Sequence, residues 1–290
     1  MSPNITILDG AMGTELRKRG VRVASYKSSI WSAYALLEDP KAVEDLHFDY
    51  IMAGSQVITA NNYAVTRKLL QREGMEDQLP ELTALACRLA QHARERARKE
   101  VLIAGSLPPL DTTYRADLVG AFEDNLVAYR EMAEVLKDHV DIILCETLTT
   151  GLEAKAAATA ALETGKKVWV SMTLSPEGDR LRGGESIEDA LDELEALDID
   201  VYLFNCSATQ AISSALPKLR GLTDKPLGAY ANPVLVEPAG GEPEMRPTER
   251  LNLNEYAEIA AAWVEAGASY VGGCCDTGPE HIEKLVERFG

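Results

Sequence analysis

Near the end of the chain, the stretch Ala268-Ser269-Tyr270-Val271-Gly272-Gly273-Cys274-Cys275 joins a short apolar run to two glycines and two adjacent cysteines. Adjacent cysteines make a poor structural disulfide, because closing the ring strains the peptide bond between them. The glycines let the backbone turn tightly and approach another group closely. The stretch is therefore typical of a β-strand whose end presents two thiols to a single partner.

A third cysteine extends this pattern. Cys206 follows the apolar run Val201–Phe204, in the sequence Asn205-Cys206-Ser207. Three thiolates would bind zinc and leave its fourth position open, which is typical of a catalytic zinc site. The alternative is that the three cysteines are buried and act as small apolar side chains. The sequence has no CxxC pair to decide between these interpretations from spacing alone.

Outward from these runs, short apolar segments alternate with longer helical ones. Eight segments are predicted strands: Ile5–Leu8, Gln56–Ala60, Val101–Ala104, Ile142–Cys145, Lys167–Met172, Val201–Phe204, Leu227–Tyr230 and Ala268–Val271. Continuous apolar runs of this length suit a parallel sheet covered on both faces. Five helices are predicted between them: Glu81–Lys99, Leu118–Leu136, Leu152–Glu163, Ser186–Ala196 and Leu253–Ala266. The alternation predicts one α/β domain over residues 1–290, a single (β/α)8 barrel of the TIM type.

Local signals refine this prediction. Ser186 is a predicted N-cap, and Gly267 is a predicted C-cap after the last of these helices. The stretch from Asn232 to Pro247 is the longest one rich in Pro and Gly, and it follows the seventh predicted strand. We expect a long active-site loop there, since active-site loops follow the strands of such barrels.

Composition narrows the possible partners. The 290 residues are 46% hydrophobic and carry a formal net charge of −17, which argues against nucleic acid or an anionic membrane as a partner. Five cysteines, an odd number in a long chain, indicate reduced thiols in the cytoplasm. Met1-Ser2-Pro3-Asn4 leads into the first strand without a basic region or signal stretch. No apolar run reaches membrane-spanning length.

The barrel prediction also tests the cysteine pattern. Chemistry in such barrels lies at the carboxyl ends of the strands. The polar residues just past each predicted strand are Asp9, Asn61, Ser106, Glu146, Thr173, Cys206, Asn232 and Cys274–Cys275. The three cysteines of interest all fall on this ring, whereas Cys87 lies in a predicted helix and Cys145 lies within a strand. This placement favours the metal site over the packing interpretation.

Five motifs follow one another along the chain: Asp9-Gly10-Ala11-Met12-Gly13-Thr14-Glu15-Leu16, Ala104-Gly105-Ser106-Leu107-Pro108-Pro109, Glu146-Thr147, Asn205-Cys206-Ser207 and Gly272-Gly273-Cys274-Cys275, with Pro279-Glu280-His281-Ile282 after the cysteines. In this order and at strand ends, they resemble the motifs of the homocysteine S-methyltransferase family. The resemblance implies a homocysteine-binding barrel that uses zinc. It also implies an enzyme that moves a methyl group from a small donor to the thiol of homocysteine, giving methionine.

The resemblance implies that Cys206, Cys274 and Cys275 bind zinc and that the homocysteine sulfur takes the fourth position. Zinc is borderline soft and binds thiolates well. Coordination would keep the substrate thiol deprotonated near neutral pH. None of the four histidines, His47, His92, His139 and His281, is placed to act as a base, and a bound thiolate needs none.

The resemblance further assigns Asp9 and Glu146 to the ammonium group of homocysteine, since an ammonium needs acceptors. Backbone donors near Gly10 and Ala11 would receive the carboxylate, and Asn61 and Thr147 complete the expected substrate site. Without the resemblance, Asp9 also fits a turn before Gly10, and Glu146 fits a helix cap.

Donor recognition is less defined. Trp31 and Tyr63 could stack on a cationic donor, or they could simply pack in the fold. Family members usually continue the double cysteine with Gly-Thr, whereas this chain has Asp276-Thr277-Gly278. The Asp276 carboxylate could attract a cationic donor or accept hydrogen bonds in a turn. Repulsion from an anionic zinc–thiolate cluster favours the turn.

The chain length leaves no room for cobalamin- or folate-binding domains. We therefore expect S-methylmethionine or S-adenosylmethionine as donor, with a betaine or dimethylsulfoniopropionate second. The alternative function is a zinc thiol-binding module that presents homocysteine to a separate corrinoid methyl-carrier protein. A zinc hydrolase is a weaker alternative, because three thiolates make zinc a poor acid for activating water.

Overall fold

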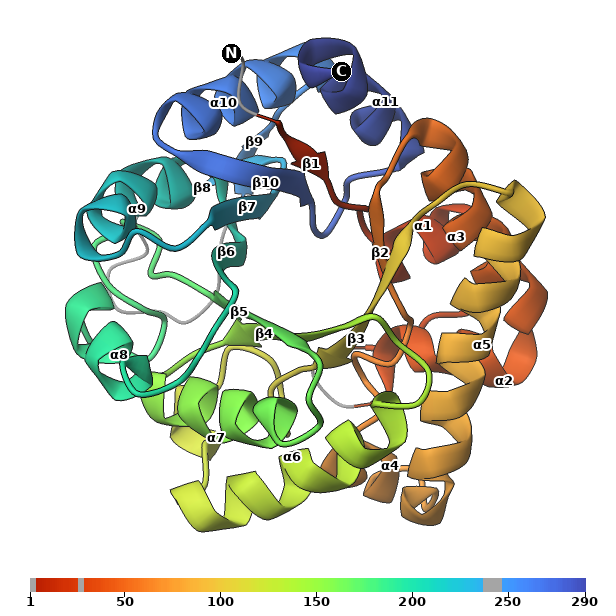
Figure 1. Cartoon of the computed structure of the whole chain (residues 1–290). Coiled ribbons are helices and arrows are strands. Elements are labelled where there is room, and N and C mark those ends of the chain that lie inside the picture. Colours follow the sequence, from red (N-terminus) through yellow and green to blue (C-terminus); the bar gives the residue numbers. More distant parts are fainter. Residues whose placement is uncertain (1–3, 26–28, 237–246) are drawn as a thin grey trace.

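Eight parallel strands form the barrel in the computed structural model, which describes residues 4–25, 29–236 and 247–290 (Figure 1). The strands are β1 (Thr6–Ile7), β2 (Val57–Thr59), β3 (Leu102–Leu107), β4 (Ile142–Leu148), β5 (Lys167–Met172), β6 (Val201–Ala208), β7 (Leu227–Asn232) and β10 (Ala268–Gly273). Their order in the sheet is β1-β10-β7-β6-β5-β4-β3-β2. A parallel bridge between Leu8 and Val57 joins the two end strands. The predicted (β/α)8 barrel is confirmed.

Helices surround the strands (Figure 1). They are α1 (Gly13–Lys18), α2 (Tyr34–Glu38), α3 (Pro40–Ala53), α4 (Arg67–Gln71), α5 (Leu79–Ala97), α6 (Phe122–Leu136), α7 (Gly151–Leu162), α8 (Ile187–Leu194), α9 (Thr209–Leu222), α10 (Leu253–Glu265) and α11 (Pro279–Phe289), with short 3-10 helices η1 (Trp31–Ala33), η2 (Glu76–Gln78) and η3 (Ala116–Leu118). The Ser186 hydroxyl accepts a hydrogen bond from the Asp189 N–H (3.0 Å), so the predicted N-cap is confirmed. Gly267 follows α10 with φ +105°, a conformation that glycine adopts readily.

The barrel interior is packed and not hollow. A cluster of buried side chains from the strands and their ends, with two residues each from β4 and β6, fills it: Leu8, Val57, Ala104, Ile142, Leu144, Trp169, Val201, Leu203 and Tyr230. Alternate residues of a strand share a face, so Ser106, Glu146, Ser171 and Asn205 form the next layer toward the carboxyl ends. A layer of polar side chains therefore lies next to the apolar cluster, on the side of the carboxyl ends of the strands.

All eight strands lie where the apolar runs predicted them, but several extend further. β3, β4, β6 and β7 continue through Leu107, Leu148, Ala208 and Asn232, respectively. The apolar runs end earlier than the strands because the strand ends carry polar residues. Ser106 and Asn232 still pair in the parallel ladder, whereas the register shifts around Glu146 and Cys206.

The stretch from Asn232 to Pro247 departs from the predicted loop. Val234–Val236 (β8) and Pro247–Arg250 (β9) pair as antiparallel strands, so the described ends of this stretch form a hairpin. Residues 237–246 of the predicted loop lie outside the described residues. No helix in the described ranges is long and apolar enough to cross a membrane.

Candidate active site at the carboxyl ends of the strands

Three thiols meet at the carboxyl ends of β6 and β10. The sulfur atoms of Cys206, Cys274 and Cys275 all lie within 4.8 Å of one another. The Cys274 N–H donates to the Ala231 carbonyl (2.9 Å), and its own carbonyl accepts from the Thr277 hydroxyl (2.6 Å). A side chain at Gly273 would collide with Thr277, which is why a glycine precedes the cysteines. The strand end and its turn thus fix both adjacent thiols beside Cys206.

This donor set fits a metal ion. Thiolates are ligands of soft and borderline cations, and three of them leave one position for a further ligand. Cys87 and Cys145 lie elsewhere, buried in α5 and β4. Burial raises the pKa of the Cys87 thiol to about 12, so this side chain behaves as an inert apolar group. All five cysteines are free thiols.

Two buried carboxyl groups lie on the same ring. Asp9 and Glu146 are each 8% exposed. The Thr59 N–H donates to Asp9 Oδ2 (2.7 Å), and the Tyr230 hydroxyl donates to Glu146 Oε2 (3.2 Å). Among the described residues, no salt bridge joins either carboxylate to a lysine or arginine. The site therefore has two acidic side chains without a compensating cation from the described chain.

Burial dominates the acidity of both groups. It raises the pKa of Asp9 to about 8, against the opposing effect of the Thr59 N–H and with a further contribution from the neighbouring Glu146 charge. Burial also raises the pKa of Glu146 to about 7, partly offset by the Ser106 and Tyr230 hydroxyls. Desolvation disfavours the ionised form of a carboxyl group. A bound cation between the two would restore their ionisation.

The expected substrate residues Thr147 and Asn61 are held by other side chains. The Asn205 amide oxygen accepts from the Thr147 N–H (3.0 Å) and from the Ser171 hydroxyl (2.7 Å). Asn205 in turn donates to the Thr147 hydroxyl (2.8 Å). The Asn61 amide group pairs with the hydroxyl and carbonyl of Ser32. In the structure these polar groups brace the strand ends.

Of the two expected backbone donors, the Ala11 N–H is already used, because it donates to the Thr277 carbonyl (2.9 Å). A side chain at Gly10 would lie 2.7 Å from the same carbonyl. The first strand and the cysteine turn therefore approach each other closely at Gly10. This contact joins the Asp9 segment to the thiol cluster.

The two aromatic residues that could stack on a donor lie in different surroundings. The Trp31 ring lies against α1, where a side chain at Gly13 would collide with it and the Arg17 guanidinium stacks 5.0 Å from its centre. Tyr63 hydrogen-bonds Thr113 (3.0 Å). Burial, together with the nearby Cys206, raises the pKa of Tyr63 well above its usual value. Tyr63 thus lies close to the thiol cluster.

Two site residues escaped sequence analysis. The Tyr114 hydroxyl donates to the Cys206 carbonyl (3.1 Å), and Tyr230 contacts Glu146. Tyr114 lies between β3 and α6, where no periodicity places a side chain. Tyr230 could have been found, since it precedes the ring residue Asn232 by two positions and shares its face of β7. The Asn232 amide oxygen is buried and has no hydrogen-bond partner among the described residues.

Asp276 has a different partner from the one expected. Its residue adopts φ +67°, and its N–H donates to the Thr14 hydroxyl (2.8 Å). Its carboxylate forms an ion pair with Arg250 Nη1 on β9 (2.8 Å). The expectation that local hydrogen bonds of the turn would take up this carboxylate is wrong, because the hairpin supplies a cation within reach.

The histidines contribute nothing to the thiol cluster. His47 is fully buried, and neither ring nitrogen has a partner among the described residues. Burial lowers its pKa to about 4, so it stays neutral. His281 Nδ1 accepts from the Gly278 N–H at the start of α11 (3.1 Å).

The fold and the site define a (β/α)8-barrel enzyme whose strand ends carry a thiol cluster suited to a metal and a pair of buried acids. Residues 6–289 match the family model described as homocysteine S-methyltransferase. The chain belongs to this family. The homocysteine S-methyltransferase of Escherichia coli is 32% identical over 98% of this chain and 95% of its own length. The selenocysteine methyltransferase of Astragalus bisulcatus is 27% identical over 97% and 91%, respectively.

Solved structures agree with this assignment. The metallated form of the homocysteine methyltransferase MmuM from Escherichia coli superposes with a TM-score of 0.84 and 30% identity. The match covers 98% of this chain and 96% of MmuM. The described barrel is thus shared over nearly its whole length with a family member that has been crystallised with metal.

Proposed function

We propose that this enzyme transfers a methyl group from a small donor to the sulfur of homocysteine, giving methionine. S-methylmethionine and S-adenosylmethionine are the first candidates for the donor, and a betaine or dimethylsulfoniopropionate is the second. The observation that carries the proposal is the thiol cluster of Cys206, Cys274 and Cys275 beside the buried acids Asp9 and Glu146. Homocysteine has a thiol and an ammonium group, and this site has a partner for each.

The resident metal would be zinc. Zinc held by the three thiolates would supply the positive charge that lowers the pKa of a substrate thiol. The metallated form of MmuM supports a resident metal, and the three thiolates favour zinc. Five free thiols also support a reducing compartment such as the cytoplasm as the place of action.

The side chains of the chain itself orient the acceptor. Asp9 and Glu146 would bind the ammonium group between them and would ionise as it enters. The buried layer of Ser171 and Asn205 holds the strand ends that carry these groups. With a sulfonium donor, the deprotonated acceptor sulfur then attacks the methyl carbon, the bond from that carbon to the donor sulfur breaks, and the donor leaves as a neutral thioether. This orientation supplies much of the rate enhancement.

The proposal is tested with purified, zinc-loaded protein, homocysteine and a panel of methyl donors, by measuring methionine. Methionine formed from a small donor alone supports the stand-alone enzyme. Formation only with a corrinoid carrier protein would instead support the presenting module. No methionine under either condition would refute the proposal.

Metal content provides a second measurement. Cys206→Ser, Cys274→Ser and Cys275→Ser are each expected to lose most of the zinc, about one ion per chain in the parent protein, because each removes one of three thiolates. Cys87→Ser is the matched control and should keep its zinc. Full retention in all three cluster variants would exclude the site.

A further inference from the structure

Two strands of the site carry a β-bulge near their carboxyl ends. The register of β4 with β5 shifts within Cys145–Leu148, and that of β6 with β7 shifts within Asn205–Ala208. Each bulge contains a non-glycine residue with a left-handed backbone, Thr147 (φ +62°) and Cys206 (φ +48°). This conformation is unfavourable for such residues and persists only where the surroundings fix it. Bulges of this kind aim side chains at active sites, and these two carry Glu146 and Cys206.

The side chain of Asn205 joins the two bulges. It is fully buried, and its amide oxygen accepts from the Thr147 N–H (3.0 Å) and from the Ser171 hydroxyl of β5 (2.7 Å). Its amide nitrogen donates to the Thr147 hydroxyl (2.8 Å). Asn205 directly precedes Cys206, and Thr147 directly follows Glu146. One amide therefore links the residues beside a predicted metal ligand and beside a site acid, across β5, which lies between β4 and β6 in the sheet.

The β6 end of this link has further support. The Ser207 hydroxyl donates to the Asn205 carbonyl (2.9 Å) and accepts from the Leu174 N–H (2.9 Å). The Tyr114 hydroxyl donates to the Cys206 carbonyl (3.1 Å). The backbone on both sides of the Cys206 side chain is thus held by hydrogen bonds from neighbouring segments.

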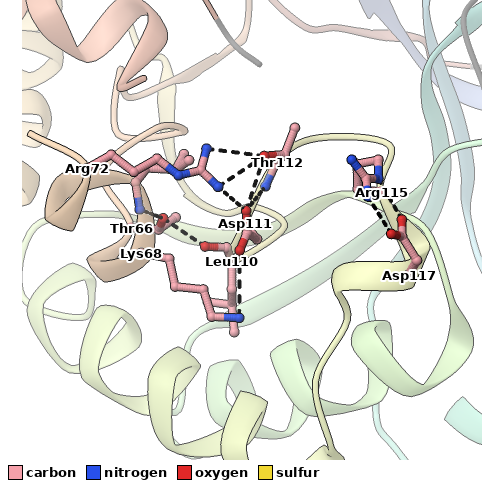
Figure 2. Close-up of polar contacts among 9 residues, drawn as sticks. Thr66, Lys68, Arg72, Leu110, Asp111, Thr112, Arg115 and Asp117 are labelled. Carbon is pink, nitrogen blue, oxygen red and sulfur yellow. Dashed lines mark hydrogen bonds and ion pairs between the residues drawn. The ribbon is translucent and has the colours of Figure 1, made fainter. Parts of the chain in front are cut away.

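The segment that carries Tyr114 is itself anchored (Figure 2). Arg72 pairs with Asp111. The Thr66 hydroxyl donates to the Leu110 carbonyl (2.9 Å). The β6 bulge therefore has a fixed place in the fold, and the Asn205 amide ties the β4 bulge to it.

The proposed acceptor needs both bulges at once. Its sulfur would be bound at the cluster that contains Cys206, and its ammonium group would be bound by Asp9 and Glu146. A short substrate spans a fixed length, so both of its ends are bound together only if the two strand ends keep one relative position. A ligand with two anchor points binds tightly only when the geometry allows both to be occupied.

We propose that Asn205 is a positioning residue that fixes the β4 bulge against the β6 bulge, so that the ammonium group and the sulfur of homocysteine are bound together. The inference rests on the proposed function and adds a residue to it that touches neither end of the substrate. It predicts that the loss of Asn205 affects a ligand with both anchor points far more than a ligand with one.

The test compares three ligands of the zinc-loaded protein by calorimetry. Homocysteine has both anchor points, norvaline keeps the amino-acid end without the thiol, and 1-propanethiol keeps only the thiol end. Asn205→Leu should weaken homocysteine binding by about 10- to 100-fold, because it leaves the partners of a buried amide unpaired and frees the bulges to shift. The affinities for norvaline and for 1-propanethiol should each stay within about two-fold.

Thr147→Val is a milder variant of the same link, since it keeps the side-chain shape and removes only the hydroxyl that accepts from Asn205. It should give the same pattern with a loss of about three-fold for homocysteine, and it tests the link even if Asn205→Leu does not fold. Asn125→Leu is the matched control. Asn125 is also a buried asparagine, but it lies on α6, where its amide donates to the Gly120 carbonyl (3.0 Å), so all three affinities should stay unchanged.

An unchanged homocysteine affinity in the Asn205 and Thr147 variants would overturn the inference. So would an equal loss for homocysteine and for one of the single-anchor ligands, because Asn205 would then support that one anchor alone. Either result leaves the proposed function intact. Failure of the parent enzyme to make methionine from any donor would instead refute the proposed function, and the inference with it.

Discussion

Burying the carboxyl groups of Asp9 and Glu146 costs desolvation free energy, and we infer that a ligand compensates for it. A buried carboxyl group with few partners resists ionisation, as the raised pKa values of about 8 and about 7 show. Fully apolar residues at these positions would make a more stable barrel. Destabilised groups of this kind collect at functional sites.

Their titration gives a pH prediction. Binding an ammonium group requires ionised carboxylates, so binding should release protons near neutral pH. We expect the affinity for methionine, a thiol-free analogue of the acceptor, to fall by at least about ten-fold between pH 8 and pH 6. The ionised fraction of a carboxyl group with a pKa of about 7 falls about ten-fold over this range, and that of a group with a pKa of about 8 falls further. Calorimetry in buffers of different ionisation enthalpy would count the protons. A pH-independent affinity with no proton release would contradict the assignment.

The free energy of unfolding should depend on pH in the opposite direction from the ligand affinity. Both carboxyl groups have a higher pKa in the folded protein than their usual values of 3.8 and 4.5. The native state therefore holds protons that the unfolded chain has released. The contribution of these groups to the free energy of unfolding is greatest below pH 4 and is lost as pH rises toward 8.

Substituting Asp9 and Glu146 should separate their contribution to substrate binding from their contribution to stability. Asp9→Asn and Glu146→Gln should each weaken homocysteine binding by about 100-fold, because each removes one charged partner of a buried pair. Neither should lower the melting temperature, since each removes a desolvation cost. Glu153→Gln is the control: Glu153 is equally buried but bonds Thr149 at the start of α7 (2.8 Å), so its loss should lower stability and spare binding. Unchanged homocysteine kinetics in both site variants would exclude the role.

For individual site residues, the position at the end of a predicted strand was the informative signal in the sequence. It brought Cys206, Cys274 and Cys275 together correctly, because a residue that follows an apolar run in a parallel barrel has only one edge on which to lie. Tyr114 could not be found in the same way. Its place depends on how the segment between β3 and α6 folds over the carboxyl ends of the strands, which apolar periodicity does not encode.

Among the elements, the β8–β9 hairpin is the part that differs most from expectation. Rich in Pro and Gly, the stretch from Asn232 to Pro247 indicated a loop, yet its ends pair as Val234–Val236 with Pro247–Arg250. A short antiparallel pair needs few apolar residues, and its register depends on the partner strand. The hairpin brings Arg250 to Asp276, a contact that no local sequence pattern contains.

This ion pair supports a prediction about Asp276. The pair is largely exposed on the arginine side, and such pairs contribute about 0 to 1 kcal/mol. Asp276→Asn should therefore lower the free energy of unfolding by less than about 1 kcal/mol and leave zinc content unchanged. Thermal unfolding and metal analysis would measure both. A large rise in KM confined to cationic donors would instead show that the carboxylate serves the donor.

Across the whole molecule, the alternation of apolar runs with helices was sufficient to predict the barrel, because each parallel strand must be covered on both faces and must return by a crossover. The strand ends were less predictable. β4 and β6 reach Leu148 and Ala208 through Glu146 and Cys206, and the pairing register with the neighbouring strand shifts at both places, so these site residues interrupt the regular ladder. Function interrupts the apolar pattern at the edge where chemistry takes place.

Metal binding should act on the whole barrel. Cys206 lies on β6, and Cys274 and Cys275 follow β10, with β7 between these strands in the sheet. A bound ion would link strands on both sides of β7 in the native state alone. At a free metal concentration 100-fold above its Kd, this linkage adds about 2.7 kcal/mol, or roughly 5 to 10 °C in melting temperature for a chain of this size.

Removing zinc with a chelator should therefore lower the melting temperature by roughly that amount without unfolding the protein at room temperature, because the apolar core of the barrel is independent of the metal. Cys206→Ser should melt near the temperature of the chelated parent and should respond little to the chelator. Cys87→Ser, whose thiol lies in α5, should keep the full response. Equal chelator sensitivity of the Cys206 variant and the parent would place the stabilising metal somewhere other than the thiol cluster.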